Sequence, residues 1–150
     1  MNISERKESH TVLVVDDSPE TISMLNDVLN SEGLTTLVAL NGSQALTVTQ
    51  NFTPDIILLD AIMPGIDGFE TAKLLSSNNA LADVPIIFMT GHGELPMAVD
   101  AMKAGAFDFV EKPFDESFLV DRLNSANSVG EKRRQKAKEI QGIERHLDRL

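Results

Sequence analysis

Five short apolar runs, separated by segments with helical periodicity, limit the folds open to this chain. The runs are Thr11–Val15, Leu34–Leu40, Asp55–Asp60, Pro85–Thr90 and Ala106–Val110. Several are continuously apolar instead of alternating, as from Ile56 to Leu59 and from Ile86 to Met89. Strands of that kind are buried on both faces of a parallel sheet that helices cover. The pattern predicts an α/β fold, a doubly wound five-stranded parallel sheet with helices on both faces.

The segments between the runs carry recognisable helix ends. Ser18 can cap a helix whose first residue is Pro19, and Gly33 suits the left-handed residue that closes it. The other helices are expected from Asn41 or Ser43 to about Asn51, from Gly68 onward, over Leu95–Lys103, and along an inward stripe of Phe118, Leu119, Leu123 and Ala126.

After Ala126 the helical pattern thins and then resumes as a C-terminal helical extension. Gly130 and Gly142 would each weaken a continuous helix by about 1 kcal/mol relative to Ala. The apolar residues at 3-4-3 spacing are Ile140, Ile143, Leu147 and Leu150. They fit either a short coiled-coil seam or a single amphipathic helix. We divide the chain into a disordered segment (1–10), a folded domain (11–127) and a helical linker (128–150).

Composition and charge exclude several classes of function. The 150 residues include no cysteine, which excludes disulfides, zinc–thiolate sites and cysteine catalysis. The N-terminus lacks an apolar signal core, and no apolar run reaches the roughly 20 residues that span a bilayer, so a cytoplasmic protein with no membrane partner is expected. Residues 131–150 hold seven of the 13 Lys/Arg and four of the 23 acids, leaving six basic and 19 acidic residues in positions 1–130, a net charge of −13. Such a body repels DNA.

Polar residues stand at the carboxyl ends of four of the expected strands, where open α/β sheets carry their sites. They are Asp16 and Asp17, Asp60, Thr90, and Lys112. Three adjacent carboxylates repel one another, and a hard divalent cation such as Mg²⁺, or Mn²⁺ as a substitute, relieves this repulsion. A carboxylate nucleophile, a cation, an ammonium group and a hydroxyl together suit phosphoryl transfer. Taken singly, each residue also has an ordinary structural explanation, as a helix cap, a turn residue or a surface lysine.

Four stretches resemble the receiver domains of two-component response regulators. They are Val12 to Ser18, Leu59 to Gly68, Met89 to Gly93, and Phe109 to Phe114. The resemblance covers about residues 10–127 and implies the flavodoxin-like strand order 2-1-3-4-5. It also implies a sensor histidine kinase as the phosphodonor.

The resemblance assigns metal and acceptor roles to four residues. Asp60 accepts the phosphoryl group. Asp17 ligates Mg²⁺ directly, Asp16 mainly through water, and the backbone carbonyl of Ile62 supplies a further ligand. A carboxylate acceptor is thereby built into the metal site.

The remaining roles concern the phosphoryl oxygens and the switch. Lys112, Thr90 and Ala61 bind the phosphoryl group. Thr90 is the switch hydroxyl, and Phe109 occupies the switch-aromatic position. The bond before Pro113 resembles the cis peptide of the family.

Two positions that vary within the family bear on signal lifetime. Ile62 is too apolar to orient an attacking water, which predicts slow self-dephosphorylation. His92 works against this prediction, because an imidazole could position water or bind metal.

The segment from His92 to Gly105 is similar to receivers of nitrogen-fixation-type DNA-binding regulators. We therefore expect a phosphorelay switch that re-models the surface of the fourth helix and fifth strand. It would form a homodimer on phosphorylation and reach DNA only through an output domain that is not in this chain.

Other readings stay open. The alternatives to a transcriptional switch are a standalone phosphate shuttle and a scaffold receiver. A multiple-turnover phosphatase or phosphotransferase is disfavoured, because no aspartate lies two positions after Asp60 to act as general acid. A nucleotide-binding fold is disfavoured because Asp16-Asp17-Ser18 replaces a glycine-rich phosphate loop.

Overall fold

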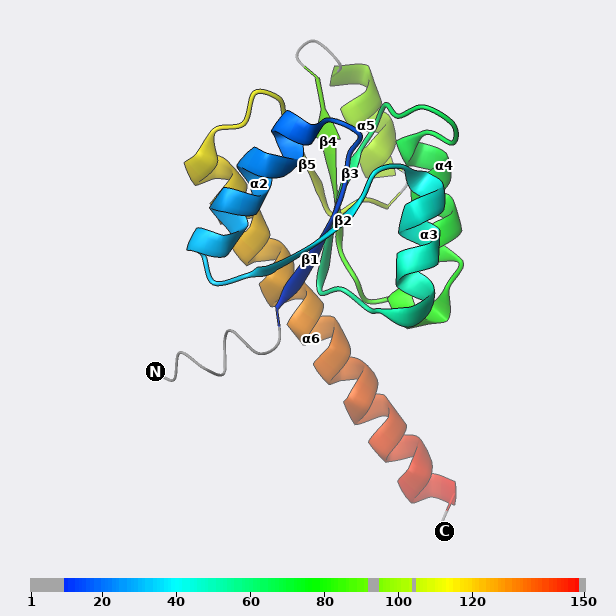
Figure 1. Cartoon of the computed structure of the whole chain (residues 1–150). Helices are drawn as coiled ribbons and strands as arrows, with labels where there is room; N and C mark the ends of the chain where they lie inside the picture. The colour runs from blue at the N-terminus through cyan, green and yellow to red at the C-terminus, as the bar shows by residue number, and fades with distance from the viewer. Residues whose placement is uncertain (1–9, 92–94, 104, 149–150) are drawn as a thin grey trace.

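The computed structural model describes residues 10–91, 95–103 and 105–148, which form a twisted parallel sheet between two layers of helices. The strands are β1 (Thr11–Val15), β2 (Thr35–Ala39), β3 (Ile56–Asp60), β4 (Ile86–Thr90) and β5 (Asp108–Glu111). Their order in the sheet is β2-β1-β3-β4-β5, and every neighbouring pair is parallel (Figure 1). This confirms the predicted fold class and strand order; the observed ends differ from the predicted ones by no more than two residues.

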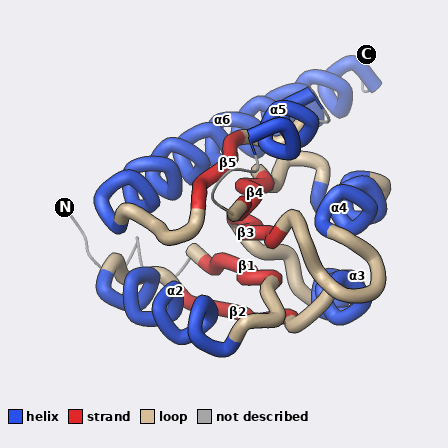
Figure 2. The backbone as a smooth tube through the Cα atoms, turned by 90° about the horizontal axis from the view of Figure 1, so that it is seen from above, coloured by secondary structure: helices blue, strands red, loops and turns tan. Residues whose placement is uncertain are grey.

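Helices follow each strand and cover both faces of the sheet. They are α2 (Pro19–Ser31), α3 (Gly42–Asn51), α4 (Gly68–Ser76), α5 (Leu95–Lys103) and α6 (Glu116–Asp148), with a short 3₁₀ turn η1 (Asn79–Leu81) after α4. Seen from above, α2 and α6 lie on one face of the sheet, and α3, α4 and α5 lie on the other (Figure 2). The continuously apolar strands are buried between these layers.

Side-chain alternation divides the core into two clusters. Val12 and Val14 of β1 pack toward α2 and α6, whereas Leu13 and Val15 pack toward the opposite helices. All four are fully buried. A strand with both of its faces covered in this way has no solvent-facing position, which explains the absence of polar alternation in its sequence.

Capping side chains begin three helices, and glycines follow two helices, at positions that the sequence indicates. The side chains of Ser18, Asn41 and Asp67 cap α2, α3 and α4, each by accepting a hydrogen bond from the backbone N–H of the third residue of its helix. Gly33 and Gly105 adopt positive φ angles of 78° and 100°, as expected for residues that follow a helix.

Helix α6 includes the predicted C-terminal extension, and one of its residues differs from its prediction. It runs without interruption from Glu116 to Asp148, although Gly130 and Gly142 lie within it. A Cβ at Gly130 would meet the Pro85 ring at 3.3 Å, so tertiary packing offsets the low helix propensity at this position. Phe118 was expected to face inward but is 50% exposed, because the adjacent Leu119 takes the inward direction and successive helix residues point about 100° apart. Arg122 lies over the Phe118 ring at 5.7 Å.

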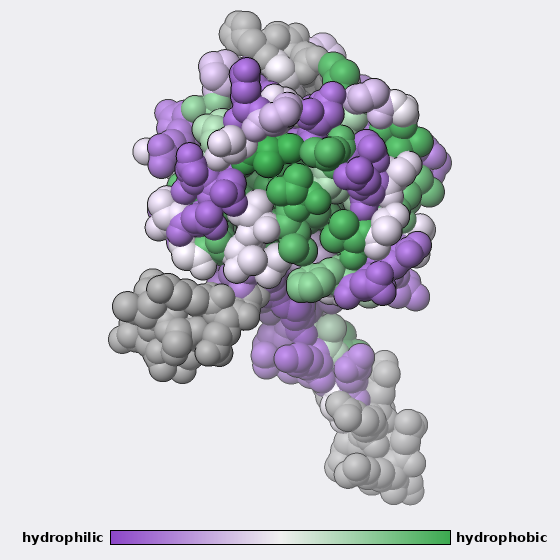
Figure 3. Space-filling view, in the orientation of Figure 1, coloured by the Kyte–Doolittle hydropathy of each residue, from purple (hydrophilic) through white to green (hydrophobic). Residues whose placement is uncertain are grey.

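A hydrogen bond and an ion pair anchor α6 to the base of the sheet. Glu131 lies 3.1 Å from His10 Nε2, and Arg134 lies 3.8 Å from Asp55. The first seven residues assigned to the linker therefore pack on the folded body, and the helix projects from it afterwards. The face of this projecting part seen in Figure 3 is mostly hydrophilic. Residues 1–9 and the side chains of Ile143, Leu147 and Leu150 lie outside the described residues.

Membrane-spanning character is not found in these helices. Among the helices of residues 10–91, 95–103 and 105–148, none combines the length and the apolar character needed to cross a bilayer.

Candidate functional site

Three acidic side chains meet at the carboxyl edge of the sheet. Asp16 and Asp17 follow β1, and Asp60 is the last residue of β3. One carboxylate oxygen from each lies within 4.8 Å of the others. Asp16 is fully buried, Asp60 is 8% exposed, and Asp17 faces solvent. The predicted convergence of these strand ends is therefore observed.

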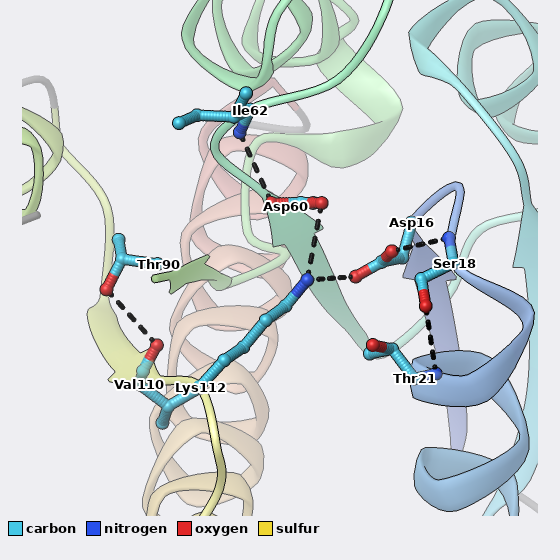
Figure 4. A network of polar contacts seen from close by, with 8 residues as sticks. All are labelled: Asp16, Ser18, Thr21, Asp60, Ile62, Thr90, Val110 and Lys112. Carbon is cyan, nitrogen blue, oxygen red and sulfur yellow. Dashed lines mark hydrogen bonds and ion pairs between the residues drawn. The ribbon is translucent and has the colours of Figure 1, made fainter. Parts of the chain in front are cut away.

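Lys112 reaches into this acidic cluster from the segment after β5. Its Nζ lies 2.8 Å from Asp16 Oδ2 and 3.4 Å from Asp60 Oδ2 (Figure 4). Its side chain is 27% exposed, so the charge contacts are partly shielded from water. In the sequence, Asp16 lies 96 positions and Asp60 lies 52 positions before Lys112.

The environment shifts the pKa of both partners. Burial raises the pKa of Asp60, as does the nearby Asp16 charge, while Lys112 and the Ile62 N–H oppose this shift. Burial alone would lower the pKa of Lys112, but its hydrogen bond to Asp16 and the charges of both acids raise it overall. The lysine is therefore a fixed positive charge at neutral pH.

Other predicted residues surround the acceptor carboxylate. Thr90, the last residue of β4, is 2% exposed, and its Oγ1 donates a 3.4 Å hydrogen bond to the carbonyl of Val110. The Ile62 N–H donates to Asp60 Oδ1 at 3.2 Å, and its side chain is 54% exposed. The Ala61 N–H donates to the Met89 carbonyl at 3.0 Å, so it is engaged in the sheet.

The remaining predicted positions lie near this group. Phe109 on β5 is partly buried against the core under α4 and α5. The Lys112–Pro113 bond is cis. His92 lies outside the described residues.

Ser18 is a site residue that the sequence indicated only as a helix cap. Its backbone N–H donates to Asp16 Oδ1 at 2.8 Å, while Lys112 holds Oδ2. Both oxygens of Asp16 are thus fixed. The signal was present in the sequence, because an aspartate readily accepts from the N–H two residues on.

The carboxylate cluster suits a small, hard cation. Magnesium prefers oxygen ligands at about 2.1 Å, and one oxygen from each of the three carboxylates lies within 4.8 Å of the others. The solvent-facing position of Asp17 leaves room for bound waters. Asp16, Asp17 and Asp60 could therefore hold Mg²⁺, and the Ile62 carbonyl lies on the adjoining loop.

Magnesium is expected to raise the melting temperature, because a cation that binds only the folded state stabilises it. Asp17→Asn should lose most of this increase, since it removes one negative ligand. A thermal melt with Mg²⁺ or with EDTA measures the effect, and Mn²⁺ should substitute. Asp27→Asn on the exposed face of α2 is the matched control. Equal increases in Asp17→Asn and wild type would argue against a role for Asp17 in metal binding.

Comparison with known proteins places this geometry in a family. Residues 12–124 match the model of the response regulator receiver domain. The C4-dicarboxylate transport transcriptional regulatory protein DctD of Pseudomonas aeruginosa is 39% identical over 118 residues, which are 79% of this chain and 25% of DctD. The DNA-binding response regulator MtrA of Mycolicibacterium smegmatis is 39% identical over 114 residues, which are 76% of this chain and 49% of MtrA.

A solved structure of NtrX from Brucella abortus, in complex with ADP, superimposes with a TM-score of 0.80 at 27% identity, covering 86% of this chain and 29% of NtrX. The chain thus spans a quarter to a half of the length of these relatives. Receiver domains are phosphorylation-dependent signalling modules that partner with sensor histidine kinases and hold Mg²⁺ in an acidic pocket. On the match over residues 12–124, this chain belongs to the receiver-domain family of two-component response regulators.

Proposed function

We propose that this chain is a signalling switch in which Asp60 accepts a phosphoryl group from a histidine kinase. The supporting observation is that Asp16, Asp60 and Lys112 come from three separate strand ends. Lys112 Nζ lies 2.8 Å from Asp16 Oδ2 and 3.4 Å from Asp60 Oδ2. An Asp60 oxygen attacks phosphorus, the bond from phosphorus to the donor nitrogen breaks, and the imidazole leaves with the electron pair. Mg²⁺, when bound by the acids, offsets the charge of the phosphoryl oxygens.

Lys112 and Thr90 then hold the product. Lys112 Nζ lies 3.4 Å from Asp60 Oδ2 and can donate to a phosphoryl oxygen beside it. Thr90 would exchange its long 3.4 Å bond to the Val110 carbonyl for a phosphoryl oxygen. Phe109 lies on the neighbouring strand and would turn inward as the hydroxyl moves. Phosphorylation would in this way bias a two-state element.

Intact mass after incubation with acetyl phosphate tests this function. One phosphoryl group should add to the wild-type chain in the presence of Mg²⁺ and not in EDTA. No adduct under either condition would leave a receiver fold without receiver chemistry. Turnover of a phosphate ester over many cycles would instead favour an enzyme.

The exposed Ile62 side chain is expected to make self-dephosphorylation slow. Ile62 is two residues after Asp60 and its backbone N–H contacts the acceptor carboxylate, and its 54% exposed side chain is an apolar group that cannot orient water. Ile62→Asn should therefore shorten the lifetime of the phosphorylated form several-fold. Loss of the phosphoryl adduct over time, by intact mass after removal of the donor, measures this; a wild-type lifetime of seconds would contradict it. The role predicted for His92 stays untested, because this residue lies outside the described residues.

The surface formed by α5, β5 and the start of α6 is our proposed dimer interface. Its exposed apolar side chains are Val99 and Met102 on α5 and Phe118 on α6, at 42 to 50% exposure. Arg122 on α6 pairs with Asp108 on β5 at 2.9 Å, which ties the two elements together. Movement of Thr90 and Phe109 underneath would re-model this surface.

Phosphorylation is expected to convert a monomer into a dimer, and Phe118→Ala should weaken the dimer strongly. Buried aromatic anchors carry much of the energy of an interface. Sedimentation velocity with acetyl phosphate and Mg²⁺ measures the change. Phe52→Ala is a matched control, because Phe52 has a similar exposure of 52% beyond α3. An unchanged sedimentation coefficient in fully phosphorylated protein would favour the phosphate shuttle.

A transcriptional output is the final part of the proposal. The relatives DctD and MtrA carry names of transcriptional and DNA-binding regulators, and this chain matches only part of each. The acidic body of residues 1–130 is unsuited to contacting DNA directly. Control of DNA binding would therefore pass through dimerisation.

A further inference from the structure

Gly42, the first residue of α3, lies directly against the segment that follows the acceptor strand. A Cβ at this position would lie 2.2 Å from Thr71 Oγ1, 2.5 Å from Ile66 Cγ1 and 2.6 Å from Ile66 Cδ1. Real Cβ atoms do not approach other heavy atoms so closely. The absent side chain is thus what allows α3 to contact both Ile66 and Thr71.

Thr71 has little freedom to give way. It is fully buried, its Oγ1 donates to the Asp67 carbonyl at 2.8 Å, and its backbone N–H donates to the same oxygen at 2.9 Å. Asp67 in turn caps α4 by accepting from the Glu70 N–H at 2.8 Å. A group added at Gly42 would therefore press on the fixed Thr71 and would displace Ile66 together with the loop that carries it.

That loop, residues 61–67, is closed on itself and linked to the acceptor. Its ends meet where the Gly68 N–H donates to the Ala61 carbonyl at 3.0 Å. Within it, the Ile62 N–H donates to Asp60 Oδ1 at 3.2 Å. A displacement of Ile66 would be carried through this short loop to the backbone of Ile62 and so to the Asp60 carboxylate.

We propose that Gly42 is a positioning residue for phosphorylation: by admitting Ile66 against α3, it holds the loop of residues 61–67 where Ile62 orients Asp60 and completes the metal site. This inference rests on the proposed phosphoacceptor function of Asp60. Gly42 itself touches neither the acceptor nor the metal ligands, and it acts through Ile66.

Gly42→Ala in the whole chain tests the inference. We expect Mg²⁺ affinity, measured by titration calorimetry, to fall by about tenfold. This is the lower end of the loss in metal affinity that follows mutation of residues that support a metal ligand. The rate of phosphoryl uptake from acetyl phosphate at subsaturating Mg²⁺ should fall as well. Val28→Ala, a buried change in α2 on the opposite face of the sheet, controls for lost stability. It should lower the melting temperature without changing Mg²⁺ affinity.

A double-mutant cycle with Ile66→Ala separates positioning from general destabilisation. Ile66→Ala removes two of the three close atoms, and alone it should also weaken Mg²⁺ binding because the loop loses its contact with α3. In Gly42→Ala/Ile66→Ala the added methyl group occupies part of the vacated space. The combined loss of affinity should thus be smaller than the product of the two single losses.

Five outcomes are decisive. Weaker Mg²⁺ binding in both single variants with coupling in the double variant supports positioning through Ile66. Independent effects in the cycle, or wild-type affinity in Gly42→Ala, would overturn it while wild-type phosphorylation stays intact. If Gly42→Ala does not fold, wild-type Mg²⁺ affinity in Ile66→Ala would overturn it. A wild-type chain that neither binds Mg²⁺ nor takes up phosphoryl would overturn the proposed function as well.

Discussion

Asp60→Asn is expected to abolish phosphoryl uptake and, in EDTA, to raise the melting temperature. An amide at this position keeps the acceptor for the Ile62 N–H but is no longer a carboxylate nucleophile. Burial and the Asp16 charge raise the pKa of Asp60, which means that the fold disfavours its ionised form. The neutral isostere removes this cost, so the variant loses function and gains stability.

The measurement pairs intact mass after acetyl phosphate with a thermal melt at neutral pH. Magnesium should reverse the order of stability, because it stabilises wild type more than a variant that has lost one anionic ligand. Asp27→Asn, which removes an exposed charge on α2, should change neither phosphorylation nor melting appreciably. A phosphoryl group still found on Asp60→Asn would mean that a different residue is the acceptor.

Gly68→Ala is expected to lower the free energy of unfolding by about 2 to 4 kcal/mol. Gly68 is the first residue of α4, and a Cβ there would lie 2.3 Å from the Asp60 carbonyl oxygen and 2.7 Å from Ala61 Cα. Both atoms belong to the backbone of the acceptor strand and its loop, so no side-chain rotation relieves the clash. Helix α4 or the end of β3 must shift.

Urea denaturation of Gly68→Ala beside Gly142→Ala measures this cost. A Cβ at Gly142 meets nothing within 4 Å, so that change should be neutral or add up to about 1 kcal/mol of helix propensity. The two substitutions add the same methyl group to a helix and differ only in surroundings. Equal stability of the two variants would contradict the close approach of α4 to β3.

The strand ends were the most predictable part of the molecule. Parallel strands end at one edge of a sheet, so Asp16, Asp60 and Thr90 could be brought together from sequence order alone. Which of these side chains pair with one another was harder to predict from the sequence. Lys112 lies closer to Asp16 than to Asp60, and this depends on the buried geometry of both oxygens of Asp16.

Errors arose where tertiary contacts override local pattern. Phe118 has the spacing of a core residue, yet it is 50% exposed while its neighbour Leu119 in the same turn of α6 is fully buried. Gly130 lowers the local helix propensity, and the helix nevertheless runs through it close to Pro85, whose ring would lie 3.3 Å from an added Cβ. Helical periodicity predicts neither the exposure of Phe118 nor the approach of Gly130 to Pro85, because both depend on the folded arrangement of the chain.

Because α6 is held at its base, a small tilt there produces a larger displacement at its far end. From Arg134, which pairs with Asp55, the helix continues to Asp148. At 1.5 Å per residue this is an arm of about 21 Å, so a tilt of about 10° at the base moves its far end by about 4 Å. A rearrangement too small to alter the sheet would thus become a displacement comparable to the spacing of neighbouring atoms in contact. Whatever is joined to that end receives a change in position and direction.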